Sequence, residues 1–530
     1  MFPLSEKGDE MMNVLEANHV KIEVQDRLLV SAERLLIGAG DRIGLVGKNG
    51  SGKTTLLRVL SGYDNPAGGS VQVKGRVTVL PQLKQIDAQK SGGELTQRLI
   101  AEALLEEPKL LLADEPTTHL DTAHIEWLEK QLSSFNGAVL TVSHDRAFLD
   151  AVCTVIWELE GGRLRTYSGN YTAYAAQKEE ERRRHEIEYE TYERTKKGLE
   201  QAIAVKEQRA ARAVKKPASI GSSEARNMKP HYAKRQKKLQ QTAKAIEKRM
   251  EKLEKVEKPR KKAPIQMSAA KQESLKGRVV VRAEKLSGKA GLRPLWQPAD
   301  FIIKGGEKIV LIGSNGSGKT TLLKKIIQGD ENLTLAPAAR VGYFSQHLDV
   351  LEPHLSILEN AKGRSGHDEA LIRTVLARLG FQREDVFKKV GVLSGGERVK
   401  TVLAQLLLSD ANMLVLDEPT TFLDTEALEA LESLLSEYIG TVLFATHDRR
   451  FAEKIAEKVI AIHDRSLHMF DGKLTEYRQK QGMSKRDEQA EGKLVLETKI
   501  AEVISRLSIG PSEELEKELE RLFEIKRSWK

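Results

Sequence analysis

A glycine-rich nonapeptide occurs twice in the sequence, as GKNGSGKTT at residues 47–55 and as GSNGSGKTT at residues 313–321. Each copy follows a short apolar run typical of a β-strand and precedes residues that favour a helix. Glycines in this context let successive backbone N–H groups surround an anion at the N-terminus of a helix, where the helix dipole also attracts negative charge. Two matches in the same context predict two phosphate-binding loops rather than two simple turns.

The lysine and threonine near the end of each copy complete the pattern. Lys53 and Lys319 are expected to neutralise the β- and γ-phosphates of a nucleotide, and Thr54 and Thr320 to place a hydroxyl on Mg²⁺. Glycines that served only as turns would not need this pair. The loop residues expected to bind ATP are Gly47, Asn49, Gly50, Gly52, Lys53, Thr54 and Thr55, and in the second copy Gly313, Asn315, Gly316, Gly318, Lys319, Thr320 and Thr321.

Three further motifs follow each loop at equal spacing. They are SGGE at 91–94 and 394–397, DEPTT at 114–118 and 417–421, and HDR at 144–146 and 447–449. The serine of SGGE and the glutamate of DEPTT are 24 residues apart in both halves, and that glutamate and the histidine are 29 apart. Equal offsets predict the same α/β scaffold twice in tandem.

In combination these motifs resemble those of the ABC ATPase family, over about residues 14–165 and 279–473. The resemblance implies that two nucleotide-binding domains pack head to tail, with each ATP between the phosphate loop of one and the SGGE segment, or signature, of the other. It pairs Lys53 and Thr54 with Ser394, Gly395, Gly396 and Glu397, and Lys319 and Thr320 with Ser91, Gly92, Gly93 and Glu94.

The remaining site residues follow from the charge of the phosphates. Asp114 and Asp417, each at the end of an apolar strand, are expected to help hold Mg²⁺. We expect Glu115 and Glu418 to orient and polarise the attacking water, and His144 and His447 to contact the γ-phosphate. The resemblance further implies that Gln82 and Gln346 bridge metal and water. Positioning and electrostatic stabilisation suffice for phosphoryl transfer, so two competent ATPase sites are predicted.

The surroundings of the two sites differ. No aromatic residue that could stack on adenine is evident near 22–26, and Trp296 is the candidate in the second half. From Gln346 to Ser394 is 48 residues, enough for a helical arm, whereas from Gln82 to Ser91 is only 9. In ABC transporters this arm receives the membrane subunits, so its near absence from the first half argues against a transport role.

Positive charge is concentrated in one central segment. The 530-residue chain has 85 Lys and Arg against 76 Asp and Glu, a net charge of +9. Residues 171–262 alone carry 27 basic and 14 acidic residues, so the rest of the chain is slightly acidic. A solvated helix pair usually has balanced signs, whereas unbalanced positive charge is typical of a surface that binds nucleic-acid phosphates.

Composition also restricts the class of protein. With 40% hydrophobic residues the chain can form more than one core, which excludes global disorder. The chain contains no uninterrupted apolar run of about 18 residues, so no membrane-spanning helix is predicted. The single cysteine, Cys153, cannot form an intrachain disulfide, which fits a reducing cytosol, so we expect a cytoplasmic protein.

The basic segment reads as an antiparallel helical hairpin. Residues 174–216 and 233–258 favour helix, and the prolines at 217 and 230 bracket an expected turn at 218–229. In the second stretch Leu239, Ile246 and Leu253 recur every seven residues, with Thr242, Arg249 and Val256 at the expected alternate seam positions.

Two ATPase domains joined by a basic hairpin resemble the ABC-F family, and specifically its antibiotic-resistance, ribosome-protecting subgroup. Matching stretches are KKP at 215–217, QKKL at 236–239 and TKIAEVISRLSIGP at 498–511. The resemblance implies a monomer that binds the tRNA exit site of the bacterial 70S ribosome, near 23S rRNA and P-site tRNA. Its hairpin tip would displace lincosamide-, streptogramin A- or pleuromutilin-type drugs. The tip residues nominated are Lys216, Lys229, His231 and Tyr232.

The expected fold is therefore α/β, with two tandem ABC-type ATPase domains, a long antiparallel helical hairpin and a helical C-terminal extension. The expected boundaries are 1–170 for the first domain with its reduced arm, 171–264 for the hairpin linker, 275–480 for the second domain and 481–530 for the extension. Two alternatives stay open: a housekeeping ABC-F translation factor without a drug role and, more remotely, a DNA-associated ABC ATPase.

Overall fold

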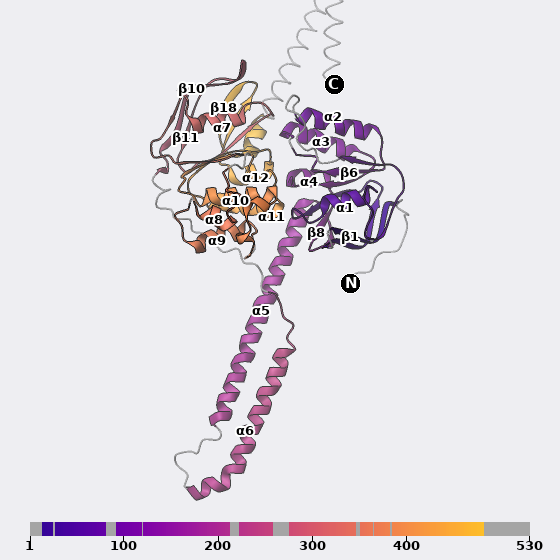
Figure 1. Cartoon of the computed structure of the whole chain (residues 1–530), viewed down its shortest axis with the longest axis vertical. Coiled ribbons are helices and arrows are strands. Elements are labelled where there is room, and N and C mark those ends of the chain that lie inside the picture. Colours follow the sequence, from indigo (N-terminus) through magenta and orange to yellow (C-terminus); the bar gives the residue numbers. More distant parts are fainter. Residues whose placement is uncertain are drawn as a thin grey trace, which may run out of the picture. The chain divides into compact units, whose positions relative to one another are not determined.

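The computed structural model describes residues 13–24, 27–80, 92–118, 120–212, 222–257, 275–345, 350–363, 365–381 and 384–481. The chain divides into two compact units, one of Met1–Tyr167 with Pro264–Lys530 and the other of Ser168–Ala263 (Figure 1). The first unit holds both copies of the repeated motifs, and the second holds the basic hairpin. The expected C-terminal extension, 481–530, lies outside the described residues after Gln481.

The first half is built on a sheet whose centre is parallel and buried. Its strands are β1 (Asn13–Val24), β2 (Arg27–Gly38), β3 (Arg42–Gly47), β4 (Gly68–Val73), β5 (Val77–Leu80), β6 (Leu110–Asp114), β7 (Ala138–Val142), β8 (Val155–Glu160) and β9 (Arg163–Ser168), in the order β4-β1-β2-β9-β8-β3-β7-β6-β5. β3 pairs in parallel with β7 and β8. Every residue of β6 and β7 is buried, as expected for parallel strands covered on both faces.

The second half repeats this order of strands but divides it between a three-stranded and a six-stranded sheet. Its strands are β10 (Val279–Ala290), β11 (Arg293–Lys304), β12 (Lys308–Gly313), β13 (Leu333–Leu335), β14 (Val341–Phe344), β15 (Met413–Asp417), β16 (Thr441–Ala445), β17 (Lys458–His463) and β18 (Ser466–Asp471). The parallel centre reads β14-β15-β16-β12-β17, matching β5-β6-β7-β3-β8 of the first half. The prediction of one α/β scaffold used twice is confirmed.

Helices connect the strands and cover the sheets. Those of the first half are α1 (Lys53–Leu60), α2 (Gly92–Leu105), α3 (Thr122–Ser134) and α4 (Arg146–Val152). Those of the second half are α7 (Lys319–Gln328), α8 (Ile357–Lys362), α9 (Glu369–Arg378), α10 (Gly395–Leu407), α11 (Thr425–Glu437) and α12 (Arg449–Ile455), with 3₁₀ turns η3 (Asp385–Phe387) and η4 (Val390–Val392). The corresponding helices α2 and α10 both begin at the first glycine of SGGE.

The two halves differ between the strand before the signature and the signature helix. In the second half α8 and α9 fill this stretch, and their buried side chains, such as Ile357 and Leu376, join one core with Leu403 of α10 and Leu431 of α11. In the first half β5 ends at Leu80 and α2 begins at Gly92, so only 81–91, outside the described residues, connect them. The described residues of the first half therefore contain no counterpart of α8 or α9.

The basic hairpin consists of α5 (Tyr171–Arg212) and α6 (Ser222–Glu251), which lie side by side (Figure 1). The expected turn at 218–229 is wrong in extent, because α6 already begins at Ser222, where Glu, Ala, Arg, Met and Lys all favour helix. The helix continues through Pro230, which lacks the N–H of one backbone hydrogen bond. Lys229, His231 and Tyr232 therefore lie on α6, although their side chains, like all of Lys216, are outside the described set.

The seam of the hairpin also differs from expectation at alternate positions. Leu239 and Ile246 are half-buried as predicted, but Thr242 and Arg249 are exposed, and the buried residue between them is Ala243. Positions along such a seam are separated alternately by three and four residues. The expected pattern placed three residues after Leu239 and four before Ile246, whereas the structure has four after Leu239 and three before Ile246. The predicted helix is also too long, since α6 ends at Glu251.

Candidate functional site

The two phosphate loops have the same conformation. Gly52 and Gly318 precede α1 and α7 with φ of 103° and 104°, a left-handed conformation that favours glycine. The Lys53 ammonium donates hydrogen bonds to the Gly47 and Lys48 carbonyls at 2.7 and 3.0 Å. Lys319 does the same to Gly313 and Ser314 at 2.9 and 3.2 Å. Burial lowers the pKa of both lysines, an effect that Glu115 and Glu418 partly oppose. Both loops are thus formed with their cation in place.

A carboxylate and a hydroxyl meet beside each loop. Asp114, at the end of β6, hydrogen-bonds with Thr54, and Asp417, at the end of β15, with Thr320. Burial raises the pKa of both aspartates, and these hydrogen bonds partly lower it. Such pairs of hard oxygen donors fit Mg²⁺, which is held by few protein oxygens together with phosphate. No cluster of three or more acidic, His or Cys side chains that could hold a metal exists in the described part of the chain. Gln82 and Gln346 lie outside the described residues.

The glutamates that follow these aspartates are strained and buried. Glu115 and Glu418 have φ of 51° and 52°, a left-handed conformation that is costly for a residue with a side chain. Within the described residues, Oε1 of each is buried without a hydrogen-bond partner. Burial raises the pKa of both to about 8. Oε2 of each accepts the backbone N–H of His144 or His447. Backbone strain together with one unsatisfied buried carboxylate oxygen is typical of a catalytic position rather than of a structural one.

The histidine of each HDR motif faces the glutamate of its own half. His144 Nε2 lies 3.4 Å from Glu115 Oε1, and His447 Nε2 lies 3.4 Å from Glu418 Oε1. Burial lowers the pKa of both histidines to about 3, helped by the nearby loop lysines. Both imidazoles are therefore neutral at physiological pH and have one N–H to donate.

The structure brings the first phosphate loop against the signature of the second half. Asn49 Nδ2 donates to the Phe422 carbonyl at 2.8 Å. A Cβ at Gly396 would lie 3.0 Å from Asn49 Nδ2 and 2.8 Å from the Phe422 carbonyl oxygen, so only glycine allows this approach. Ser394 caps α10 in a capping box with Glu397, and Gly395 is the first residue of that helix. In the other signature Ser91 lies outside the described residues, and Gly92, Gly93 and Glu94 begin α2.

Two aspartates that sequence reasoning left without a role complete the contact. Asp121 and Asp424 cap the N-termini of α3 and α11. Asp121 also accepts a hydrogen bond from the backbone N–H of Asn315 at 3.0 Å, and Asp424 accepts one from the backbone N–H of Asn49. Each aspartate therefore contacts the phosphate loop of the opposite half. Both aspartates follow the DEPTT motif of their half at the same distance, and this repeated spacing could have indicated a shared role.

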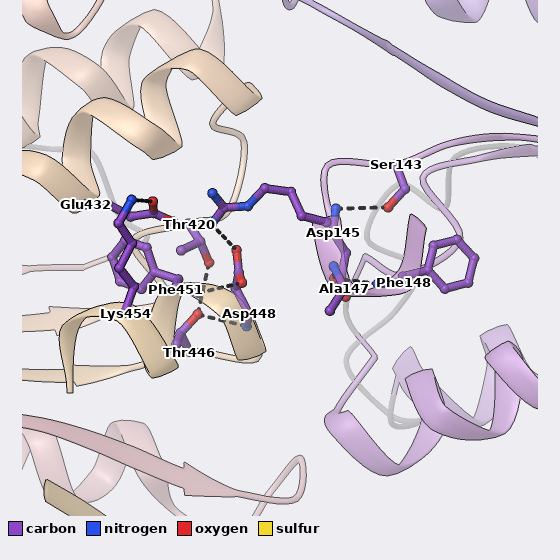
Figure 2. A network of polar contacts seen from close by, with 11 residues as sticks. Ser143, Asp145, Ala147, Phe148, Thr420, Glu432, Thr446, Asp448, Phe451 and Lys454 are labelled. Atoms are coloured by element: carbon purple, nitrogen blue, oxygen red, sulfur yellow. Dashed lines mark hydrogen bonds and ion pairs between the residues drawn. The ribbon is translucent and has the colours of Figure 1, made fainter. Parts of the chain in front are cut away.

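A second pair of cross-contacts lies at the arginine of each HDR motif. Arg146 hydrogen-bonds Glu432 on α11, and Arg449 hydrogen-bonds Glu129 on α3, so the contacts are reciprocal. Lys454 also donates to Glu432 at 2.8 Å, and Arg146 lies 3.7 Å from Asp448, whose pKa burial raises to about 6. Figure 2 shows Glu432, Lys454 and Asp448 gathered on the second half, opposite Ser143 and Asp145 of the first. The sequence pattern gave no indication of these partners.

Trp296 does not serve as the expected stacking aromatic. It is 1% exposed, and its indole N–H donates to the Leu286 carbonyl at 3.2 Å. Its ring lies against Gly318, where a Cβ would be 2.6 Å away. Trp296 is thus a buried support behind the phosphate loop, and that burial excludes stacking on a base.

Comparisons with known proteins agree with this geometry. A family model described as ABC transporter matches residues 32–90 and 296–421, and a second model of the same description matches 157–267. Ribosome protection protein VmlR of Bacillus subtilis (strain 168) is 32% identical over 97% of this chain and 97% of its own. The chain belongs to the ABC-F family of ATPases.

Other ABC-F relatives and solved folds are consistent with that assignment. Erythromycin resistance ATP-binding protein MsrA of Staphylococcus epidermidis is 33% identical over 86% of this chain and 98% of its own. The structure titled RNase-L Inhibitor shares the fold, with a TM-score of 0.58 at 18% identity, over 87% of this chain and 91% of that one. This ABC-F protein is an ATPase and binds ATP. None of its described helices has both the length and the apolar character of a membrane span.

Proposed function

We propose that this ABC-F ATPase is a cytoplasmic ribosome protection factor that acts as a monomer, its two halves pairing within one chain. In its ATP-bound form it enters the tRNA exit site of the bacterial 70S ribosome, where its hairpin tip reaches the peptidyl-transferase centre. There it displaces drugs of the lincosamide, streptogramin A or pleuromutilin type. The observation that carries this proposal is the 32% identity to a ribosome protection protein along nearly the whole of both chains.

The hairpin supplies the surface for RNA. Residues 171–262 carry 27 basic and 14 acidic side chains, and Lys237, Lys238 and Lys244 of α6 are exposed. Among the side chains of α5 and α6 that the structure describes, only a narrow seam is buried, so most of their charge faces solvent. Such a surface binds 23S rRNA or P-site tRNA chiefly through phosphates, and we expect binding to weaken steeply with salt.

The ATP sites supply the switch. Lys53 and Lys319 bind the phosphates, and neutral His144 and His447 donate a hydrogen bond to the γ-phosphate. Glu115 and Glu418 hold and polarise the attacking water once deprotonated. Thr54 with Asp114, and Thr320 with Asp417, hold Mg²⁺, which neutralises part of the phosphate charge. Because Asp121, Asp424 and Gly396 contact the opposite half, bound ATP favours the closed state, and hydrolysis allows it to open.

Blocking hydrolysis tests the switch. Glu115→Gln with Glu418→Gln should leave ATP binding intact and trap the protein on ribosomes, so that it cosediments with them in ATP. The matched control adds Lys53→Ala and Lys319→Ala, which remove ATP binding and should return cosedimentation to the level without nucleotide. Dissociation as fast as that of the wild type would contradict the proposal.

Replacing the tip tests the hairpin. A short Gly/Ser turn in place of residues 218–232 should abolish drug protection while leaving ATPase activity, because the replaced residues belong to the separate hairpin unit. The readout is the minimum inhibitory concentration of each of the three drug types. Erythromycin is tested as well, because it appears in the name of the relative MsrA. Retained protection would refute the role of the tip. A full-length protein without any drug phenotype would favour the housekeeping alternative.

A further inference from the structure

The aspartates that contact the opposite phosphate loops have different partners in the two halves. Asp424 is held by Lys400, whose ammonium donates to both carboxylate oxygens at 3.1 and 3.3 Å. Asp121 is held instead by His124, with its ring Nδ1 2.6 Å from Oδ1. At the positions that correspond by the repeat, the first half has Gln97 in place of Lys400, and the second half has Ala427 in place of His124.

Lys400 lies close to the first ATP site. This site consists of the first phosphate loop with Glu115 and His144, closed by Ser394–Glu397 and Asp424 of the second half. The side chain of Lys400 projects from α10 and is 13% exposed. Burial lowers the pKa of His144. Lys53 and, from the opposite half, Lys400 lower it further. In the second site, Lys319 of the adjacent phosphate loop lowers the pKa of His447, and no described cation of α2 contributes.

The contact of Asp424 with the first loop depends on how this carboxylate is held. It accepts the N–H of Ala427 at 3.0 Å, which fixes one oxygen at the N-terminus of α11, and it also accepts the N–H of Asn49. Burial would raise its pKa, but Lys400 and these N–H groups keep the pKa below its usual value, so Asp424 is charged. An unpaired carboxylate at this depth would oppose an incoming triphosphate, whereas Lys400 neutralises it.

We propose that Lys400 is a positioning residue for the first ATP site: it fixes Asp424 against the phosphate loop of the opposite half and offsets its charge, which makes this site the tighter of the two. The second site has an imidazole where the first has an ammonium. The inference rests on the two ATP sites proposed above but is independent of the ribosome.

Site-selective binding tests the proposal. In the full chain carrying Glu115→Gln and Glu418→Gln, Lys319→Ala leaves the first site and Lys53→Ala leaves the second. Binding of a fluorescent ATP analogue to each variant gives the two affinities. Lys400→Gln, which installs the residue of the first half, should weaken the first site about tenfold and the second less than twofold. Lys400→Arg should restore most of the affinity, since it keeps the charge.

Other results overturn the proposal or its premise separately. Lys400 would only stabilise the second half if Lys400→Gln weakened both sites equally or neither site. The same conclusion would follow if Lys400→Arg weakened the first site as much as Lys400→Gln does. If the two loop variants did not each remove one binding event, the assignment of the sites would fail instead. A swap keeps the test valid should Lys400→Gln fold poorly: Gln97→Lys with His124→Ala should tighten the second site, and unchanged binding there would count against the proposal.

Discussion

The two halves agree at their phosphate loops and differ at the elements that reach across to the opposite half. Lys53 and Lys319 are both buried and donate to corresponding loop carbonyls. Glu115 and Glu418 share their burial and their left-handed backbone conformation. The described residues of the first half, however, include no counterpart of α8 and α9, and its Asp121 is held by a histidine rather than by a lysine. The candidate catalytic groups are therefore present in both halves, whereas the residues that contact the opposite half differ. This difference is the basis of the proposal that the two ATP sites differ in affinity.

The reciprocal arginine contacts show the same contrast. The side chains of Arg146 and Glu432 are 7% and 0% exposed, and those of Arg449 and Glu129 are 16% and 14% exposed. Burial alone would raise the pKa of both glutamates. At Glu432, Arg146 and Lys454 outweigh burial, and the pKa is lowered. At Glu129, Arg449 does not outweigh burial, and the pKa is raised. The first contact is thus an enclosed charge network and the second a partly hydrated pair.

The largest effect that separates these contacts is expected from Glu432→Gln. It removes the nearest anion of the buried Arg146 guanidinium, which keeps Asp448 at 3.7 Å, and it removes a partner of the largely exposed Lys454. Breaking this buried pair should cost about 3 kcal/mol of unfolding free energy, the lower end of the range for such pairs, because Asp448 remains. Glu129→Gln is the matched control and should cost about 1 kcal/mol or less, because water reaches that pair. Denaturant unfolding of both variants without nucleotide measures the difference. Equal losses would show that the two contacts are equivalent after all.

A smaller effect should appear as a dependence of stability on pH. Glu115 and Glu418 have a folded-state pKa of about 8, above the ordinary value of 4.5, so the folded chain binds more protons than the unfolded chain between these values. Stability therefore falls as pH rises through that window. From pH 6.5 to 8 the loss is about 1.5 kcal/mol per glutamate, because the slope of roughly 1.4 kcal/mol per pH unit declines as the pKa is approached.

The histidines do not obscure this effect. Their folded-state pKa of about 3 lies below the ordinary 6.5, so their contribution changes mainly below pH 6.5. Between pH 6.5 and 8 each histidine adds only about 0.4 kcal/mol of stability, in the opposite direction to the glutamates. The thermal unfolding temperature should fall between pH 6.5 and 8 in the wild type and stay level or rise slightly in Glu115→Gln with Glu418→Gln. The two single variants should each remove about half of the slope. A slope that survives in the double variant would place the titrating group elsewhere.

How far the sequence predicts the site depends on whether a residue acts within its own half. The loops, Asp114 with Thr54, and Glu115 with His144 follow from fixed spacing on one scaffold, and the structure brings each pair together. Glu432 and Lys400 could not be found in this way, because their importance arises only when another half, or another helix, is packed against them. Trp296 failed for a related reason: its burial behind Gly318 is a property of packing, not of spacing.

The smallest expected effect concerns an ion pair that has no counterpart. Arg450 of α12 contacts Asp150 of α4, but the residues that correspond by the repeat are Ala147 and Glu453, which cannot form the reciprocal pair. Both side chains are partly exposed, at 33% and 22%, so the pair should contribute only about 0.5 kcal/mol to unfolding free energy and less at high salt. Arg450→Ala, Asp150→Asn and the double variant form a cycle that isolates this coupling. A coupling above about 2 kcal/mol would mean that this one-sided contact, rather than the enclosed network at Arg146, dominates the asymmetry between the halves.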